Sequence, residues 1–297
     1  MLTLRHPIIF TSAAWLLTIG MVAAAGKDDV PRLLDEARDA FRRGDSAKAV
    51  DLAGQAIAAD PQGVDGYSFR GQLHAAMQQP QAAVDDFTKV IDRAPSAGLY
   101  ELRGSEQFKL GNIDESIADF DREIKLAPAR EREHWKRGIS YYYAKRYDEG
   151  RKQFEAYQTF DDNDVENAVW RFLCMARGEG LEAARKTILK IRRDPRVPMM
   201  EVYDMFAGQL TPADVLKAVE AGEPSEQALH QRRFYAHLYL GLFFDATGDV
   251  EKAREHIRLS AEKYPVKHYM ADVARVHHRR LQEKAAADKD QAKPRTN

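Results

Sequence analysis

The sequence is poor in cysteine and in net charge, and each absence excludes a class of protein. Cys174 is the only cysteine among the 297 residues, so an internal disulfide framework and a cysteine-rich metal site are excluded. Lys and Arg number 45 and Asp and Glu number 46, which gives a formal charge of −1. This balance argues against a nucleic-acid-binding arm and against a polybasic membrane patch.

Motifs of known catalytic and metal sites are also absent. The chain has no Gly-x-Ser-x-Gly elbow, no glycine-rich phosphate loop and no His-Glu-x-x-His helix. His277 and His278 are adjacent, so they would point to different sides of a helix. His230 and His237 would share a helix face but lie about 10 Å apart, which is too far for one metal ion. We therefore expect a protein that is not an enzyme and that needs no cofactor and no metal.

The first 25 residues have the pattern of a signal peptide. Arg5 supplies the positive start, residues 8–22 are mostly apolar, and three alanines precede Gly26. Cleavage after Ala25 predicts an exported protein, periplasmic or secreted, with no stable membrane insertion once the signal is removed. Alternatively, the apolar stretch remains as an N-terminal membrane anchor, because its length is near the lower limit for spanning a bilayer.

Three segments near the N-terminus repeat one pattern at a spacing of 33–34 residues. Each segment ends in a proline, at Pro61, Pro95 and Pro128. A small residue comes first in each copy, at Ala37, Gly71 and Gly104, and a packing residue follows, at Ala53, Phe87 and Phe120. A fourth copy contains Gly138 and Phe154, and a displaced fifth copy contains Gly241, Ile257 and Pro265.

This pattern resembles the tetratricopeptide repeat (TPR), a pair of helices. Small residues stand where two helices cross closely, and proline ends the second helix because it cannot continue one. The prediction is an all-α solenoid of helical hairpins, with four repeats over residues 30–162. Residues 163–222 keep helical periodicity without the repeat signature, with helices expected over 165–176, 181–191 and 199–208 and from Thr211 onward. A fifth repeat and a capping helix are expected over 223–284, and a disordered tail over 285–297.

Partner binding is the function that a TPR solenoid makes available. The first helix of each hairpin lines the concave face, and the positions left free by the packing signature face the groove. These positions are Arg38, Phe41, Arg42, Ser68, Gln72, Glu101, Ser105, Phe108, Lys109, Trp135, Ile139, Tyr142 and Tyr143. Aromatic anchors with a few charges suit peptide or protein binding. Alternatively, Trp135, Tyr142 and Tyr143 pack internally against the helices of 165–222.

From the fourth repeat onward the chain resembles the NlpI family, TPR lipoproteins of the bacterial outer membrane. The residues that carry the resemblance include Arg137-Gly138-Ile139, Tyr142-Tyr143, Tyr157-Gln158, Asn163-Asp164, Trp170 and Gly248-Asp249. The resemblance implies an envelope scaffold that docks a periplasmic protease and peptidoglycan hydrolases and forms homodimers. Unlike that family, this chain has no lipidation cysteine after its signal, which puts membrane tethering in doubt.

Two functions therefore compete. The first is a non-catalytic protein–protein adaptor in the bacterial cell envelope. The second is an envelope module that binds a peptide or a cell-wall glycan, with the aromatic residues as a stacking platform. A sugar site pairs aromatic rings with several Asp, Asn or Gln side chains, and only Gln72, Glu101 and Ser105 are near candidates. This small number favours the adaptor.

Overall fold

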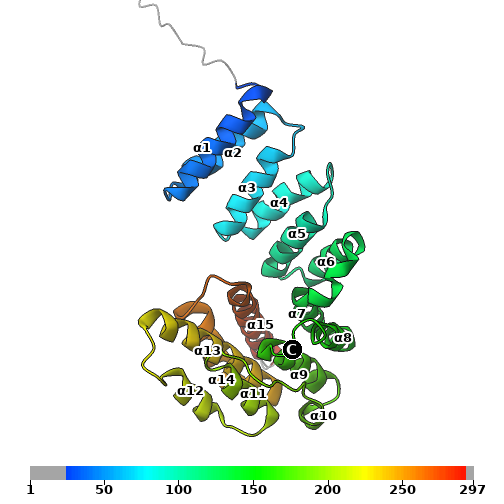
Figure 1. The fold of residues 1–297 in the computed structure, drawn as a ribbon, viewed down its shortest axis with the longest axis vertical. Coiled ribbons are helices and arrows are strands. Elements are labelled where there is room, and N and C mark those ends of the chain that lie inside the picture. The colour runs from blue at the N-terminus through cyan, green and yellow to red at the C-terminus, as the bar shows by residue number, and fades with distance from the viewer. Residues whose placement is uncertain (1–24, 292–297) are drawn as a thin grey trace, which may run out of the picture.

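The computed structural model describes residues 25–291, and all regular elements within this range are helices. Residues 1–24, which hold most of the predicted signal peptide, and residues 292–297 lie outside the described part of the chain. The described part confirms the predicted all-α hairpin solenoid. Figure 1 shows a curved stack of helix pairs that continues into a bundle near the C-terminal end.

Eight helices form four consecutive hairpins. Their bounds are α1 Val30–Arg42, α2 Ser46–Ala59, α3 Asp65–Ala76, α4 Pro80–Ile91, α5 Ala97–Leu110, α6 Ile113–Leu126, α7 Trp135–Tyr143 and α8 Tyr147–Tyr157. Two short 3-10 helices, Lys27–Asp29 and Pro128–Glu133, precede α1 and α7. The first helix of each pair lies in the inner layer of the stack, on the side where the last helix of the chain lies (Figure 1).

The rest of the chain forms less regular helices and one further hairpin. Their bounds are α9 Val165–Gly178, α10 Leu181–Lys186, α11 Met199–Ala207, α12 Pro212–Val219, α13 Glu226–Thr247, α14 Val250–Arg258 and α15 Tyr269–Gln291. A π-helix, Leu259–Lys263, continues α14. The predicted start at Thr211 is confirmed, because its side chain accepts a hydrogen bond from the Asp214 amide in a capping box.

Each central hairpin is held by a contact between a glycine and a phenylalanine. A Cβ atom at Gly71 would come within 2.8 Å of the Phe87 ring, and one at Gly104 within 2.9 Å of the Phe120 ring. At Gly138 the corresponding distance to the Phe154 ring is 2.7 Å. All three phenylalanines have no exposed surface, so their rings have no room to move away. The repeated glycine is therefore required by the close approach of two helices.

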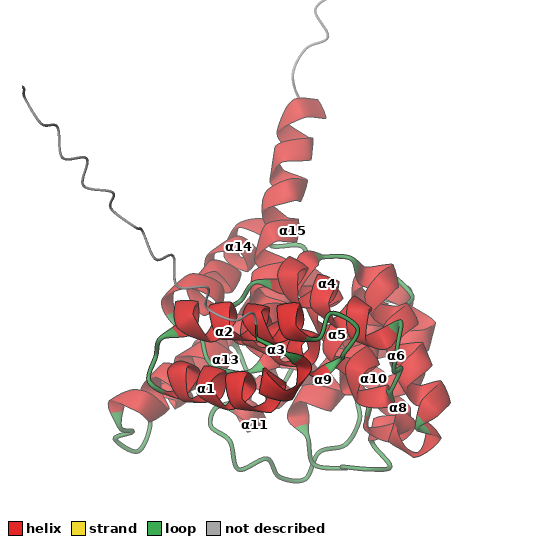
Figure 2. Ribbon diagram, turned by 90° about the horizontal axis from the view of Figure 1, so that it is seen from above, coloured by secondary structure: helices red, strands yellow, loops and turns green. Residues whose placement is uncertain are grey.

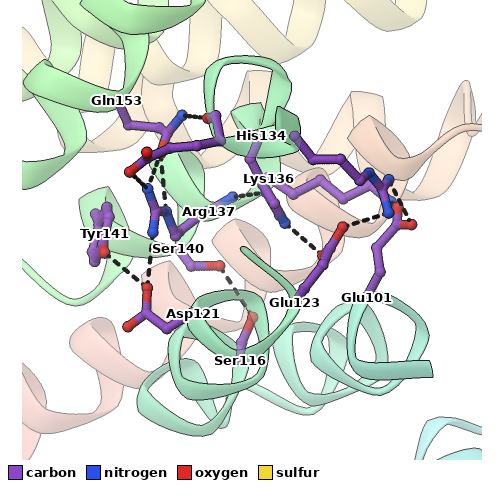
Figure 3. Close-up of polar contacts among 12 residues, drawn as sticks. Glu101, Ser116, Asp121, Glu123, His134, Lys136, Arg137, Ser140, Tyr141 and Gln153 are labelled. Carbon is purple, nitrogen blue, oxygen red and sulfur yellow. Dashed lines mark hydrogen bonds and ion pairs between the residues drawn. The ribbon is translucent and has the colours of Figure 1, made fainter. Parts of the chain in front are cut away.

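An arginine beside each of these glycines clamps the two helices together. Arg70 donates to both carboxylate oxygens of Asp86, over 2.7 and 2.9 Å, and Arg103 donates to both oxygens of Asp119, over 2.7 and 2.8 Å. In the fourth repeat Arg137 donates twice to Oε1 of Gln153, as Figure 3 shows. The arginine directly precedes the glycine, and its partner directly precedes the phenylalanine. The arginine and its partner are therefore recurring positions in the sequence, but the repeat pattern described above did not include them.

Two expectations about helix ends are wrong. The helix expected over 181–191 ends at Lys186, and the next regular element begins at Met199. The Arg171 guanidinium donates hydrogen bonds to the Thr187 carbonyl and hydroxyl. The Thr187 carbonyl therefore has a hydrogen-bond partner without a further turn of helix. The tail expected to be disordered from residue 285 continues as helix to Gln291, in a stretch rich in alanine and lysine, which favour helix. The end of α15 stands away from the body in Figure 2.

The last helix does more than cap the final hairpin. α15 packs against α14, as a cap does, and also against α5 on the inner side of the stack. Arg275 of α15 donates to Oε1 of Gln78, and Arg280 donates to the Tyr143 carbonyl over 2.7 Å. The chain thus folds back onto the concave face of its own repeats.

A matched pair of glycine substitutions tests the helix contact. Gly104→Ala should lower the free energy of unfolding by about 1–3 kcal/mol, because the new methyl group meets the buried Phe120 ring. Gly54→Ala, in the helix α2 with open space around its Cβ position, should instead raise it by about 0.5–1 kcal/mol through helix propensity. Urea unfolding followed by circular dichroism measures both. Changes of the same sign would contradict the close contact.

Candidate functional site

The open part of the concave face lies on α1 and α3. Two adjoining hollows there have volumes of about 480 Å³ and about 390 Å³. Both are lined by Asp35, Arg38 and Phe69. We call this surface the N-terminal groove. It contains the five predicted residues of the first two repeats, which are Arg38, Phe41, Arg42, Ser68 and Gln72.

The N-terminal groove combines an aromatic centre with exposed charges. The Arg38 guanidinium lies 5.2 Å from the centre of the Phe69 ring and 2.5 Å from Oδ1 of Asp35. Arg42 pairs with Asp39, and its side chain is 78% exposed. Pairs this exposed contribute little stability, so both arginines can exchange partners at small cost. Phe69, which the sequence patterns did not indicate, is half-buried and forms the apolar centre.

The concave face of the third and fourth repeats is covered, and here the predicted open groove has to be corrected. Phe108 and Ile139 have no exposed surface, and Tyr142 and Tyr143 are 6% and 4% exposed. α9 and α15 occupy the space that a partner was expected to fill. Their side chains Trp170, Tyr269 and His277 contact these rings. The predicted internal packing against the helices of 165–222 therefore explains the contact with Trp170, whereas Tyr269 and His277 belong to α15.

The contacts of Tyr143 show how tightly this half is closed. Its ring lies 5.4 Å from that of Phe108 and 6.2 Å from that of Trp170. Its hydroxyl oxygen is 3.0 Å from Nδ1 of His277, and burial raises the pKa of this hydroxyl and lowers the pKa of His277 to about 4. Both groups are therefore neutral at physiological pH, as a buried hydrogen-bonded pair should be.

The polar residues predicted for the third repeat are also engaged within the chain. Glu101, labelled in Figure 3, accepts a hydrogen bond from Lys136 over 2.8 Å. It also accepts one from Arg130 over 3.0 Å. Lys109 donates to Glu106 over 2.6 Å and lies 3.8 Å from Asp272 of α15. Ser105 is buried, with 8% of its surface exposed. Glu101 and Lys109 are thus paired within the closed half, and the buried Ser105 hydroxyl has no hydrogen-bond partner among the described residues, so these side chains do not form a free charged rim.

Trp135 belongs to a different feature, an aromatic cavity at the junction of the repeats and the C-terminal helices. Its indole stacks on His268 at 6.2 Å and meets Tyr269 edge-on at 5.3 Å. The cavity has a volume of about 210 Å³, and Tyr157, Trp170 and Tyr235 also line it. We call it the junction cavity.

Acidic side chains converge at the junction cavity around one arginine. Nη2 of Arg196 is 2.7 Å from Oδ1 of Asp164 and 2.5 Å from Oδ2 of Asp194, and Nη1 is 2.7 Å from Oε2 of Glu166. Burial and the nearby Glu166 charge raise the pKa of Asp164 to about 6, because Arg196 is shared among three carboxylates and offsets only part of the cost. Sequence patterns did not indicate this cluster, whose members lie up to 32 residues apart.

Within residues 25–291, no three His, Cys, Asp or Glu side chains are placed to hold a metal ion. The described helices include none that is long and apolar enough to cross a membrane. Cys174 is buried, and burial raises the pKa of its thiol, so it is a packing residue and not a nucleophile.

The repeats match a known family. A model of the tetratricopeptide repeat family matches residues 34–98 and 102–165. This part of the chain therefore consists of tetratricopeptide repeats. The match covers the four N-terminal hairpins, in which the glycine–phenylalanine contacts occur.

Solved structures show the same fold at low sequence identity. A TPR protein from Parabacteroides merdae is 13% identical, with a TM-score of 0.54, over 86% of this chain and 99% of that chain. MamA is 16% identical, with a TM-score of 0.51, over 67% of this chain and 97% of that one. YrrB, described as a TPR protein with an unusual peptide-binding site, is 16% identical, with a TM-score of 0.51, over 65% and 92%. At these identities the likeness concerns the fold alone.

The raised pKa of Asp164 predicts a pH-dependent effect of Asp164→Asn. An unfolded carboxyl ionises near pH 3.8 and the folded one near pH 6, so ionisation of Asp164 lowers wild-type stability as the pH rises through this window. Asparagine can keep the cap on α9 but cannot ionise. Relative to wild type, the variant should therefore gain about 1–3 kcal/mol between pH 4 and pH 7.5, measured by urea unfolding.

A second carboxyl provides the control for this measurement. Asp148 is exposed, and hydrogen bonds from Lys152 and Arg151 lower its pKa. Asp148→Asn should therefore show no gain as the pH rises. An identical pH dependence of the two variants would contradict the buried position of Asp164.

Proposed function

We propose that this protein is a non-catalytic adaptor of the bacterial cell envelope that docks partner proteins in its N-terminal groove. The proposal rests on the division of the concave face into a covered half and an open half. The half formed by α5 and α7 is filled by the chain's own helices, whereas the half formed by α1 and α3 keeps its hollows and exposed arginines.

The chemistry of the groove suits an extended peptide segment. Phe69 supplies one aromatic anchor, and Arg38 and Arg42 lie beside it with the carboxylates of Asp35 and Asp39. Aromatic anchors carry most of the energy in such contacts, and flanking charges set orientation and association rate. A partner segment with an apolar side chain between charged residues would match this surface. The peptide-binding site described for YrrB makes this use of the fold plausible for a relative in fold.

The envelope location rests on the sequence. The apolar segment with Arg5 before it and alanines after it supports export, and the resemblance to the NlpI family supports a scaffold in the same compartment. A periplasmic protease or a peptidoglycan hydrolase is the partner class that this resemblance favours, together with homodimer formation. Without a lipidation cysteine, a soluble periplasmic form is the proposed state, and an uncleaved N-terminal anchor is the alternative.

Two phenylalanine variants test the groove. Phe69→Ala should reduce recovery of the main partner by more than about tenfold, because truncating an aromatic anchor costs about 2 kcal/mol. Phe160→Ala, at a phenylalanine that is 53% exposed and lies outside the groove, should leave recovery unchanged. The tagged protein is captured from crosslinked envelopes, and partners are quantified by mass spectrometry.

A charge variant separates binding from folding. Arg42→Glu changes a side chain that is 78% exposed and should weaken capture without shifting the melting temperature. Full partner recovery by both folded Phe69→Ala and folded Arg42→Glu proteins would contradict docking in the N-terminal groove.

A further inference from the structure

The junction cavity carries an excess of negative charge that the chain does not neutralise. Asp164, Glu166 and Arg196 line the cavity, which leaves one formal negative charge in excess among these three groups. Asp194, outside the lining, also pairs with the Arg196 guanidinium and so competes for its charge. Glu166 is further engaged by the Tyr239 hydroxyl, which donates to Oε1 over 2.5 Å. A group that carries positive charge would relieve the repulsion among the carboxylates.

Two tyrosines that line the cavity have raised pKa values. Burial, together with the charges of Asp164, Asp161 and Glu166, raises the pKa of Tyr157 to about 12. Burial and the charge of Glu166 also raise the pKa of Tyr235, which lines the same cavity. Burial is the largest cause for both phenols, and the neighbouring carboxylates add a smaller contribution that disfavours further negative charge.

Two deeply buried side chains of the cavity lining have unused hydrogen-bonding capacity. Asn167 and Trp170 are each 2% exposed and line the cavity. Oδ1 of Asn167 and Nε1 of Trp170 have no hydrogen-bond partner among the described residues. The Asn167 amide nitrogen is already used, since it donates to the Phe154 carbonyl over 3.0 Å. One acceptor and one donor therefore remain available, which buried polar atoms seldom do without a ligand or water.

The walls of the cavity are aromatic. Trp135, Tyr157, Trp170 and Tyr235 come from α7, α8, α9 and α13, so four separate elements contribute rings to a volume of about 210 Å³. Aromatic faces attract ammonium and guanidinium groups, and several rings around one volume strengthen the attraction. They also cover the apolar stem of a long basic side chain.

We propose that the junction cavity binds the side chain of a lysine or arginine residue in a partner protein. The cationic head supplies donors for Asn167 and for the carboxylates, and its charge offsets the local excess. The Trp170 indole needs an acceptor, which a bare amine lacks and the peptide carbonyl beside a basic side chain supplies. A neutral sugar would satisfy hydrogen bonds but would leave the charge uncompensated.

The biological source of this residue rests on the proposed adaptor function, but the site is separate from the N-terminal groove. The two surfaces share no residue. Binding of a small probe to the cavity needs no partner protein, so failure here would leave the adaptor proposal standing. Full partner capture by the groove variants would contradict docking in the groove but would likewise leave the cavity inference standing.

Titration of the full-length protein with capped amino acids tests the cavity. Nα-acetyl-lysine methylamide should change the tryptophan fluorescence in a saturable way, because Trp135 and Trp170 line the cavity. The neutral analogue Nα-acetyl-norleucine methylamide should bind at least about tenfold more weakly, since it lacks the cation. Butylammonium, which lacks a peptide carbonyl, should bind more weakly than the capped lysine.

Variants and competing ligands make the outcome decisive. Glu166→Gln should weaken capped-lysine binding about tenfold, whereas Glu182→Gln, at an exposed acid outside the cavity, should not. Equal binding of lysine and norleucine analogues to the wild-type protein would overturn the inference, and this comparison needs no variant. Saturable binding of N-acetylglucosamine without binding of capped lysine would also overturn it, in favour of a glycan site. Binding of butylammonium as tight as that of capped lysine would overturn the assignment to a peptide residue.

Discussion

The close contact between a glycine on one helix and a phenylalanine on the next determines how the central hairpins are built. With a ring atom within about 3 Å of the position that a Cβ would take, only glycine allows the two helices to approach this closely. The neighbouring arginine and aspartate then fix the rotation of one helix about the other through a planar two-point contact. Repetition of this unit stacks the hairpins and sets the inner layer from which the concave face is made.

A helix far away in the sequence, α15, determines which part of that concave face is covered. The Tyr143 hydroxyl lies beside a ring nitrogen of His277, 134 residues later, and Phe108 packs on Tyr269. A closed aromatic interior replaces the open groove over α5 and α7, because burying these rings among α5, α7, α9 and α15 gains more than exposing them to water. α15 packs against α5 and meets the second hairpin at its turn, where Arg275 donates to Gln78, and the hollows on α1 and α3 stay open.

Local patterns predicted the fold well, and long-range contacts explain where they failed. The glycines at 71, 104 and 138 and the cap at Thr211 act within one hairpin or one turn, so their meaning can be found in a short window. The positions predicted for the groove on α1 and α3 line open hollows, and their role in binding stays a prediction. Trp135, Ile139, Tyr142 and Tyr143 have the same pattern, but a repeat pattern contains no information about which distant helix covers them. The junction cavity could not be predicted from the repeat pattern for the same reason, since its acidic and aromatic side chains come from separate elements.

The resulting molecule carries two separated surfaces of different character on one chain. The N-terminal groove is shallow, exposed and of mixed charge, whereas the junction cavity is small, aromatic and negative. A surface of the first kind binds weakly and tolerates varied segments, because its exposed ion pairs add little energy. The cavity inferred to bind a basic side chain would add selectivity, because a buried carboxylate cluster favours a positively charged group over a neutral one. When one partner reaches both, the second contact forms intramolecularly, so two modest sites together give an affinity that neither has alone.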